Sequence, residues 1–189
     1  MSLTRTEESF APLFWFKGGY PLTIATTHKT ASTTMAHTLG KKGKFNEYRE
    51  APKDKPVVLI VRHPLDRLVS AFMWFVRGPS NIIPGGGNRR FGYIDFGQFV
   101  RHTETHHNMH WTPQTFQHPR WREYKRLVPL HDLSLWWPAD LPPLDHKKKT
   151  KRMEWQSYYD DELRDRCEKR YAEDIEAYEL ACRQGVYTR

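Results

Sequence analysis

The chain has 189 residues, carries a formal net charge of +8 at pH 7, and is 38% hydrophobic and 14% aromatic. This length suits a single domain over residues 1–189, and the apolar content excludes a disordered chain. The excess of basic residues favours an anionic partner, such as a nucleic acid, a membrane surface or a polyphosphorylated ligand. No apolar run approaches the ~20 residues of a membrane span, no signal-peptide core begins the chain, and its two cysteines give no disulfide framework, so we expect a soluble, cytoplasmic protein.

The first predicted element is an N-terminal arm over residues 1–19. Its aromatic residues, among them Phe14, Trp15 and Phe16, follow no clear period, and two glycines come near its end. We expect the arm to pack on the body of the domain. The alternative is that it caps a substrate site.

The stretch 22–39 comes next and contains the clearest candidate site. Residues 22–25 are an apolar run suited to a buried strand, and Met35, Ala36 and Leu39 lie on one side of a predicted helix. The turn between strand and helix holds one lysine, one alanine and four hydroxyl side chains: Lys29, Thr30, Ala31, Ser32, Thr33 and Thr34. The first N–H groups of a helix are unpaired and its dipole places partial positive charge there, so this turn predicts a phosphate-type anion site. An ordinary helix cap, the alternative, needs only one hydroxyl.

The turn does not match the nucleotide-triphosphate P-loop pattern, G-x-x-x-x-G-K-[ST]. No glycine lies between Tyr20 and Leu39, and the lysine precedes the hydroxyl residues.

Two more strands and a helix are predicted next. Residues 45–50 alternate enough for a short strand, and residues 57–61, Val-Val-Leu-Ile-Val, suit a central parallel strand covered on both faces. Pro64 begins a helix that reaches to about Arg77, with a buried stripe formed by Leu65, Leu68, Val69, Phe72 and Val76. The repeated order of strand, turn and helix predicts an α/β fold.

Four further elements are predicted in chain order: an exposed loop over residues 78–92, a helix over 93–105, a short edge strand over 127–130 and a final helix over 157–182. Phe96, Phe99 and Val100 are expected to face inward from the first of these helices. A zinc site would need the histidines of residues 102–110, two pairs of which have i, i+4 spacing, to lie on one helix. They have no third ligand at a convincing spacing, so we expect no metal site.

A second candidate anion site follows the central strand. Residues 62–70 read Arg-His-Pro-Leu-Asp-Arg-Leu-Val-Ser, which places Arg62 at the end of the strand and Ser70 about two helical turns later. An arginine suits a phosphate because its planar fork matches two phosphate oxygens. The alternative is a helix start with a solvated arginine.

These segments resemble those of sulfotransferases that use PAPS (3′-phosphoadenosine-5′-phosphosulfate). Residues 29–34 are similar to the 5′-phosphosulfate loop of that family, and residues 62–70 are similar to its 3′-phosphate segment, R-[DH]-P-x-x-R-x-x-S. Residues 110–113, His-Trp-Thr-Pro, resemble the HW-x-P element of the carbohydrate sulfotransferases, and Tyr171 with Asp174 resembles the Y-x-x-D of their last helix. The chain departs from the residues common in the family at three positions, His28, Ala31 and His63.

The resemblance implies a P-loop-like sulfotransferase fold, with a central parallel sheet and helices on both faces. It implies an enzyme that moves a sulfuryl group from PAPS to an acceptor hydroxyl, with no metal. In that reading Lys29 stabilises the leaving phosphate, residues 30–34 hold the 5′-phosphate, and Arg62 with Ser70 holds the 3′-phosphate. Lys148 is expected to close over the donor, with a solvated surface loop as the alternative. The HW-x-P element and the many aromatic residues favour a carbohydrate acceptor, because sugar rings stack on Trp and Tyr. A lipid, a small molecule and a peptide are the alternative acceptors.

Three residues are candidates for the general base. Glu50 lies after the first helix, as the glutamate base does in some relatives, and would end the second predicted strand at the edge where parallel sheets present ligands. His110 competes, since a neutral imidazole is suited to proton transfer near pH 7, and Glu47 is a third candidate. Two other functions remain as alternatives: a small basic nucleic-acid-binding module and a nucleotide kinase of related fold. The oligomeric state is not indicated.

Overall fold

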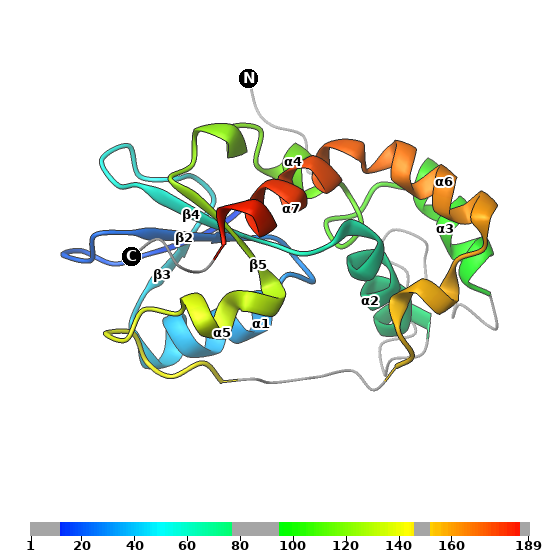
Figure 1. Ribbon diagram of the computed structural model, residues 1–189. Helices are drawn as coiled ribbons and strands as arrows, with labels where there is room; N and C mark the ends of the chain where they lie inside the picture. The colour runs from blue at the N-terminus through cyan, green and yellow to red at the C-terminus, as the bar shows by residue number, and fades with distance from the viewer. Residues whose placement is uncertain (1–11, 77–94, 146–151, 186–189) are drawn as a thin grey trace, which may run out of the picture.

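The structure is a computed structural model that describes residues 12–76, 95–145 and 152–185. A five-stranded sheet forms its centre, and helices lie on both sides of that sheet (Figure 1). The predicted loop over residues 78–92, Lys148 and residues 1–11 of the expected arm lie outside the described residues.

The sheet is mixed, with the strand order β3-β1-β2-β4-β5. Three neighbours, β2, β4 and β5, are parallel, whereas β1 is antiparallel to both β2 and β3. The strands are β1 (Leu13–Phe16), β2 (Thr23–Thr26), β3 (Asn46–Tyr48), β4 (Val57–Val61) and β5 (Arg126–Pro129). The expectation of a parallel sheet is therefore right for its centre and one edge, and wrong for β1. The predicted edge position of β5 is confirmed.

The prediction that residues 1–19 form an arm is wrong for β1, which is an interior strand of the sheet. Its residues Leu13, Phe14 and Trp15 are buried, and a strand covered on both faces shows no alternation of apolar and polar residues. The connection from β1 to β2 is too short for a crossover, so the two strands pair antiparallel. Gly19 in that connection has φ +77°, a conformation that glycine adopts without strain.

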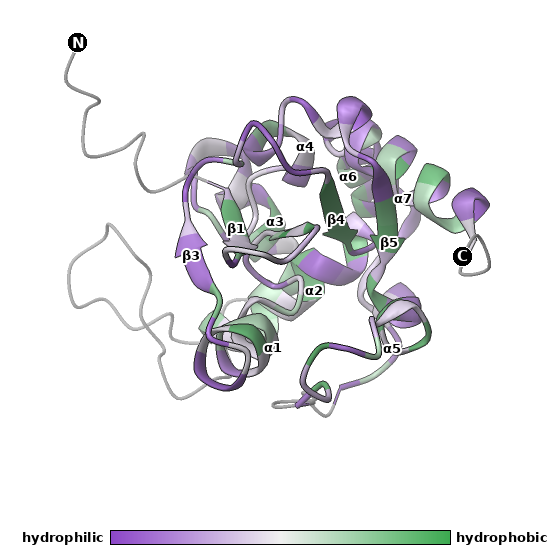
Figure 2. Cartoon of the chain, turned by 90° about the vertical axis from the view of Figure 1, so that its left-hand side faces the viewer, coloured by the Kyte–Doolittle hydropathy of each residue, from purple (hydrophilic) through white to green (hydrophobic). Residues whose placement is uncertain are grey.

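All five residues of β4 are buried, and they alternate between two cores. Val57, Leu59 and Val61 pack with Trp121 and the helix residue Ala177 on one face, whereas Ile60 packs on the other face. Figure 2 shows β4 as the most hydrophobic strand, at the centre, and β3 as a hydrophilic strand at the edge. This pattern confirms the predicted central strand with both faces covered.

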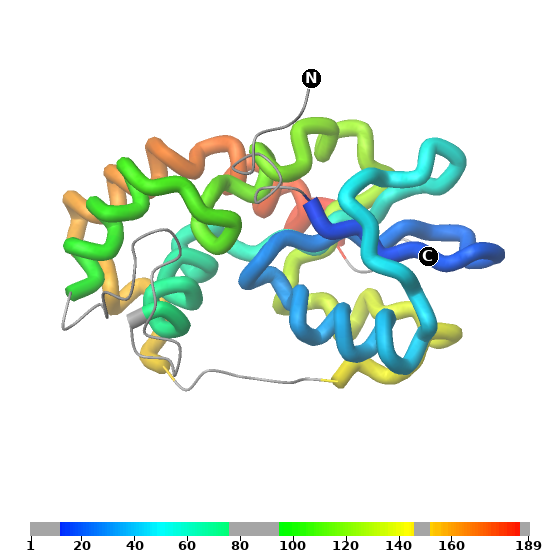
Figure 3. The backbone as a smooth tube through the Cα atoms, turned by 180° about the vertical axis from the view of Figure 1, so that it is seen from behind, coloured from blue at the N-terminus to red at the C-terminus, as the bar shows by residue number. Residues whose placement is uncertain are grey.

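The helices cover the two faces and extend beyond the carboxyl ends of the parallel strands. In Figures 1 and 3, α1 and α5 run side by side under one face, α7 lies on the other, and α2, α3 and α6 gather beyond the sheet. The α-helices are α1 (Ser32–Met35), α2 (Pro64–Val76), α3 (Phe96–Thr105), α4 (Gln114–Gln117), α5 (Leu133–Trp136), α6 (Asp161–Arg170) and α7 (Ala172–Gln184). Short 3₁₀ turns are η3 (Trp121–Glu123), η4 (Leu130–Asp132) and η5 (Trp155–Tyr158).

The helix after β2 changes its winding. α1 continues as a π-helical segment, η2 (Ala36–Lys42), in which the Gly43 amide donates to the Thr38 carbonyl five residues earlier. Met35 and Leu39 are buried as predicted, but Ala36 is exposed. A wider turn rotates successive side chains by a smaller angle than an α-helix does, so the predicted stripe is wrong at that residue.

The helix starting at Pro64 is confirmed, and Leu65, Leu68, Val69 and Phe72 are buried in it. The helix after Asp95 is confirmed as well, with its three predicted apolar residues buried. The prediction of a single final helix is wrong, because the chain bends at Tyr171 (φ −105°, ψ 23°) and forms two helices, α6 and α7. Apolar spacing cannot reveal such a break, since each half keeps its own inward face.

Candidate functional site

The two candidate anion segments meet at one edge of the sheet. β2 and β4 are parallel neighbours, so the loop that leaves β2 and the turn that leaves β4 lie side by side. The Nη1 of Arg62, after β4, donates to the Lys29 carbonyl, after β2, at 2.8 Å. The sheet thus joins two segments that the sequence separates.

The loop after β2 has an unusual backbone. Lys29 (φ 66°) and Ala31 (φ 60°) both lie in the left-handed region that few non-glycine residues adopt, at a cost of about 1–2 kcal/mol each. Ala31 is also the N-cap of α1 and has no polar side chain to cap it. Such strain persists where the surrounding structure holds it, and it concentrates at functional sites. The loop therefore presents backbone N–H groups that a bound anion could satisfy.

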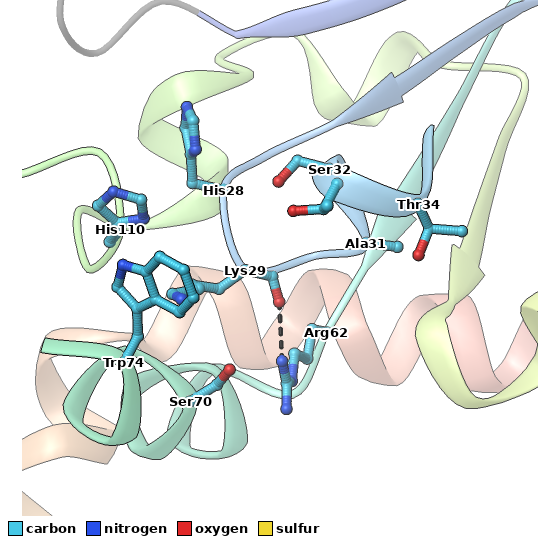
Figure 4. A pocket seen from close by; sticks show the side chains of 10 residues that line it. His28, Lys29, Ala31, Ser32, Thr34, Arg62, Ser70, Trp74 and His110 are labelled. Carbon is cyan, nitrogen blue, oxygen red and sulfur yellow. Dashed lines mark hydrogen bonds between the residues drawn. The ribbon is translucent and has the colours of Figure 1, made fainter. Parts of the chain in front are cut away.

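These segments line one cavity of about 360 Å³ (Figure 4). Figure 4 shows Ser32 and Thr34 on one side of it, Arg62 and Ser70 on another, and Lys29 between them. Its lining comprises His28, Lys29, Ala31, Ser32, Thr33, Thr34, Arg62, Ser70, Trp74 and His110. We call this the Lys29 cavity.

Two cations of the cavity are held in position by neighbouring groups. The ammonium of Lys29 lies 4.3 Å from the centroid of the Trp74 ring, a cation–π contact. The Nε of Arg62 donates to the Asp66 carboxylate at 2.7 Å, and the same carboxylate accepts a hydrogen bond from Arg152. Burial alone would raise the pKa of Asp66, but the two arginines hold that pKa below its usual value. Asp66 therefore stays charged and orients the guanidinium of Arg62.

Two imidazoles, those of His28 and His110, form the opposite wall. Burial, together with the charges of Arg67, Arg49 and Lys29, lowers the pKa of His28 to about 4. Burial also lowers the pKa of His110 to about 3, with contributions from His28, Lys29 and Arg67. Both rings are therefore neutral at pH 7 and can accept a hydrogen bond.

The comparison with known proteins agrees with this geometry. The model of the sulfotransferase family matches residues 1–132, which include both anion segments. The chain belongs to the sulfotransferase family. No curated protein and no solved structure matches it with significance. Family membership implies a transferase that moves a sulfuryl group, and it argues against the nucleic-acid-binding and kinase alternatives.

One residue of the loop after β2, Thr30, does not line the Lys29 cavity. Thr30 is fully buried, and its hydroxyl shares a hydrogen bond with the Thr27 hydroxyl at 2.9 Å and donates to Gln114 Oε1 at 3.1 Å. Its amide donates to the Thr27 carbonyl. Thr30 was expected to contact a phosphate, but it does not line the Lys29 cavity, and both of its donors have protein partners. Ala31, Ser32, Thr33 and Thr34 do line the cavity.

Gln114 connects the two anion segments. Its Oε1 also accepts from the Arg62 amide at 3.0 Å, and its Nε2 donates to the Arg62 carbonyl at 2.8 Å. The buried carboxylate of Asp174, on α7, accepts from the backbone amides of Gln114 and Thr115 at 2.8 Å each and so caps α4. The Y-x-x-D resemblance had pointed to Asp174, but no sequence signal pointed to Gln114.

The two glutamate candidates for the base lie away from the Lys29 cavity. Glu50 is exposed and lines a different cavity, near the start of β4, with residues such as Pro56 and Val57. Glu47 is exposed on β3, where Arg49 lies 3.6 Å from it. Glu50 was expected at the end of a strand in a parallel sheet, whereas β3 is an edge strand that the antiparallel β1 separates from β2. His110 is the one candidate base that lines the Lys29 cavity.

The histidines of residues 102–110 do not converge. The rings of His102 and His106 stack on each other with centroids 4.0 Å apart, while His110 faces His28. Within the described ranges no three His, Cys, Asp or Glu side chains form a group that could hold a metal ion. In the same ranges, no helix combines the length and apolar character needed to cross a membrane.

Proposed function

We propose that this sulfotransferase uses PAPS as donor and transfers its sulfuryl group to a hydroxyl, on a carbohydrate acceptor. The observation that supports this best is the convergence of Lys29, the 31–34 loop, Arg62 and Ser70 on a single cavity at the carboxyl edge of parallel strands. A cavity lined by two separate sets of candidate anion-binding groups suits a donor that carries a 5′-phosphosulfate and a 3′-phosphate. The proposal treats residues 1–189 as a single domain.

The cavity residues divide into two groups by role. Backbone N–H groups and hydroxyls of residues 31–34 would hold the 5′-phosphate, while the Arg62 guanidinium and the Ser70 hydroxyl would hold the 3′-phosphate. Lys29 would stabilise the charge that develops on the leaving phosphate oxygen. Sulfuryl transfer is an in-line displacement comparable to phosphoryl transfer, so positioning and charge stabilisation provide most of the catalysis. These cations and N–H groups supply positive charge without a metal ion.

His110 is the base we propose for the acceptor hydroxyl. It lines the Lys29 cavity, and Phe75 packs against its ring with centroids 4.9 Å apart. Trp74 gives the same cavity an aromatic wall on which a sugar ring can stack, which favours a carbohydrate over other acceptors.

Nucleotide binding tests the proposal. We expect adenosine 3′,5′-bisphosphate, the nucleotide product, to raise the melting temperature, and AMP to raise it much less, because AMP lacks the phosphate that Arg62 and Ser70 would hold. The measurement is a thermal unfolding series with each nucleotide at equal concentration. Equal shifts from both nucleotides, or none from either, would contradict PAPS as the donor.

The acceptor is tested separately. Labelled PAPS is incubated with a panel of sugars, oligosaccharides, phenols and tyrosyl peptides, and products are identified by the mass of one added sulfuryl group. Transfer confined to the phenols or peptides would refute the carbohydrate assignment and leave the donor assignment intact.

A further inference from the structure

His28 has no role in the function proposed above, yet it occupies a prominent place in the Lys29 cavity. Its ring meets that of His110 edge to face, with centroids 4.8 Å apart and planes at 68°. Figure 4 shows the two side chains coming from different loops to the same part of the cavity. Nδ1 of His110 is buried without a hydrogen-bond partner among the described residues. The cavity therefore has two imidazoles in contact, and one buried nitrogen that no group of the described segments satisfies.

One buried side chain holds both imidazole-bearing loops. The guanidinium of Arg67, only 1% exposed, donates to the His28 carbonyl at 3.0 Å. It also donates to the carbonyls of Met109 at 3.0 Å and Thr112 at 2.8 Å, on either side of His110. Because the guanidinium donates to all three carbonyls, it fixes the backbones of the two loops relative to each other. The contact between the two imidazoles therefore follows from the backbone positions that Arg67 fixes.

We propose that His28 is a second acceptor-site residue, and that His28 and His110 act as a pair in which one imidazole orients the acceptor hydroxyl while the other takes its proton. This inference rests on the proposed sulfuryl transfer. During the step the acceptor oxygen bonds to sulfur, and the bond from sulfur to the bridging phosphate oxygen breaks. Its electron pair leaves with the phosphate, beside Lys29. The hydroxyl proton passes to a nitrogen of the pair and then to solvent.

The charges around the pair support this role. Arg67 from α2, Arg49 after β3 and Lys29 face His28, and Arg67 and Lys29 also face His110. Burial lowers the pKa of both imidazoles, and these cations lower it as well, so both rings are neutral in the free protein. Phosphates bound beside Lys29 would offset these charges and strengthen both imidazoles as bases when the donor is present.

Variants of His28 test the pair. His28→Phe keeps a ring against His110 but removes both nitrogens, and His28→Gln restores a hydrogen-bonding group. His107→Phe is the matched control, because His107 is exposed in the segment that carries His110 and does not line the cavity. The probe is sulfur-labelled PAPS with water as the acceptor, read as release of inorganic sulfate, and the affinity for adenosine 3′,5′-bisphosphate is measured beside it by calorimetry.

We expect His28→Phe to slow sulfate release about 10-fold or more with unchanged bisphosphate affinity, and His28→Gln to recover part of the rate. The double variant with His110→Phe should lose no more than His110→Phe alone, because residues that act as a unit are not additive. A wild-type rate in His28→Phe, or a loss of bisphosphate affinity that matches the loss of rate, would overturn the pair. A wild-type protein that binds no bisphosphate would instead refute the proposed donor.

Side-chain nitrogen NMR gives a second readout that needs no turnover. The two imidazole signals are assigned by their disappearance in His28→Phe and His110→Phe. Bisphosphate should raise the pKa of both imidazoles, whereas the chemical shifts of the His107 nitrogens should not change. A saturated complex in which neither pKa moves would show that the pair does not lie beside the phosphates and would refute the inference.

Discussion

Replacing Gln114 by alanine should destabilise the fold and weaken the donor site together. The Gln114 side chain is 2% exposed and provides hydrogen bonds to the Arg62 amide, the Arg62 carbonyl and the Thr30 hydroxyl. Thr30 keeps its bond to the Thr27 hydroxyl after the substitution, but both Arg62 groups lose the partner that Gln114 supplies. A buried backbone group left unpaired costs about 1–3 kcal/mol. Because Arg62 is only partly buried, we take the lower half of that range for each group.

The expected loss in unfolding free energy is therefore about 3 kcal/mol, the sum for two unpaired groups. For a chain of this length that corresponds to a fall in melting temperature of about 6–12 °C. The assay is urea unfolding at pH 7, with thermal unfolding as a check. Affinity for adenosine 3′,5′-bisphosphate should fall as well, because Gln114 holds the backbone that positions the Arg62 guanidinium.

Gln117→Ala is the matched control, from the same short helix and with the same 2% exposure. Gln117 Nε2 donates to the carbonyls of Met109 and Thr112 at 3.2 Å each, but both carbonyls also accept from Arg67. Both therefore remain paired, and we expect a loss below about 1 kcal/mol with unchanged nucleotide affinity. Equal losses in the two variants would refute the reasoning, because they would show that burial alone, and not the pairing of Arg62, sets the effect.

Four further predictions concern the cavity and the buried histidines. Arg62→Ala should weaken bisphosphate binding about 10–100-fold, as expected for a lost charge-assisted pair, and calorimetry that shows less than this would move the 3′-phosphate elsewhere. Lys29→Ala should lower turnover about 10²-fold or more while affecting binding less, because the charge it stabilises develops during transfer; equal losses would make it a docking residue. His110→Ala should lower turnover about 10²-fold with bisphosphate affinity retained, and Glu50→Gln should change neither; the reverse result would place the base at Glu50. His118 is fully buried, and its Nε2 lies 3.1 Å from the Thr26 carbonyl oxygen. Burial holds the pKa of His110 at about 3 and that of His118 at about 4, below the usual 6.5, so the unfolded chain binds more protons than the folded protein as the pH falls from 6.5 towards 4. Unfolding free energy should accordingly be steady above pH 6.5 and fall below it by up to about 1.4 kcal/mol per pH unit for each imidazole, and a flat urea profile from pH 7 to 5 would contradict their burial as neutral rings.

The sequence determined the parts of this protein that depend on local pattern. The run at Val57–Val61 can only be a strand covered on both faces, and Pro64 with the apolar stripe after it sets the start and the inward face of α2. The small-residue turn around Lys29 and the arginine after β4 pointed to both candidate anion segments, because the chemistry expected of them depends on residue type and on nearness to a helix start. These features need few distant partners, so they can be read from the chain itself.

The tertiary structure decided which distant residues meet. Apolar character alone does not say whether Leu13–Phe16 is an arm or a strand, since burial on both faces erases the alternation that marks a strand. Nor does residue type distinguish Thr30, whose hydroxyl is bonded to Gln114, from Ser32 and Thr34, which line the cavity. The strand order places Glu50 at a different cavity from Lys29. Packing between two loops places His28 against His110. Each outcome depends on hydrogen bonds and packing between segments far apart in the chain, and those contacts exist only once the sheet has formed.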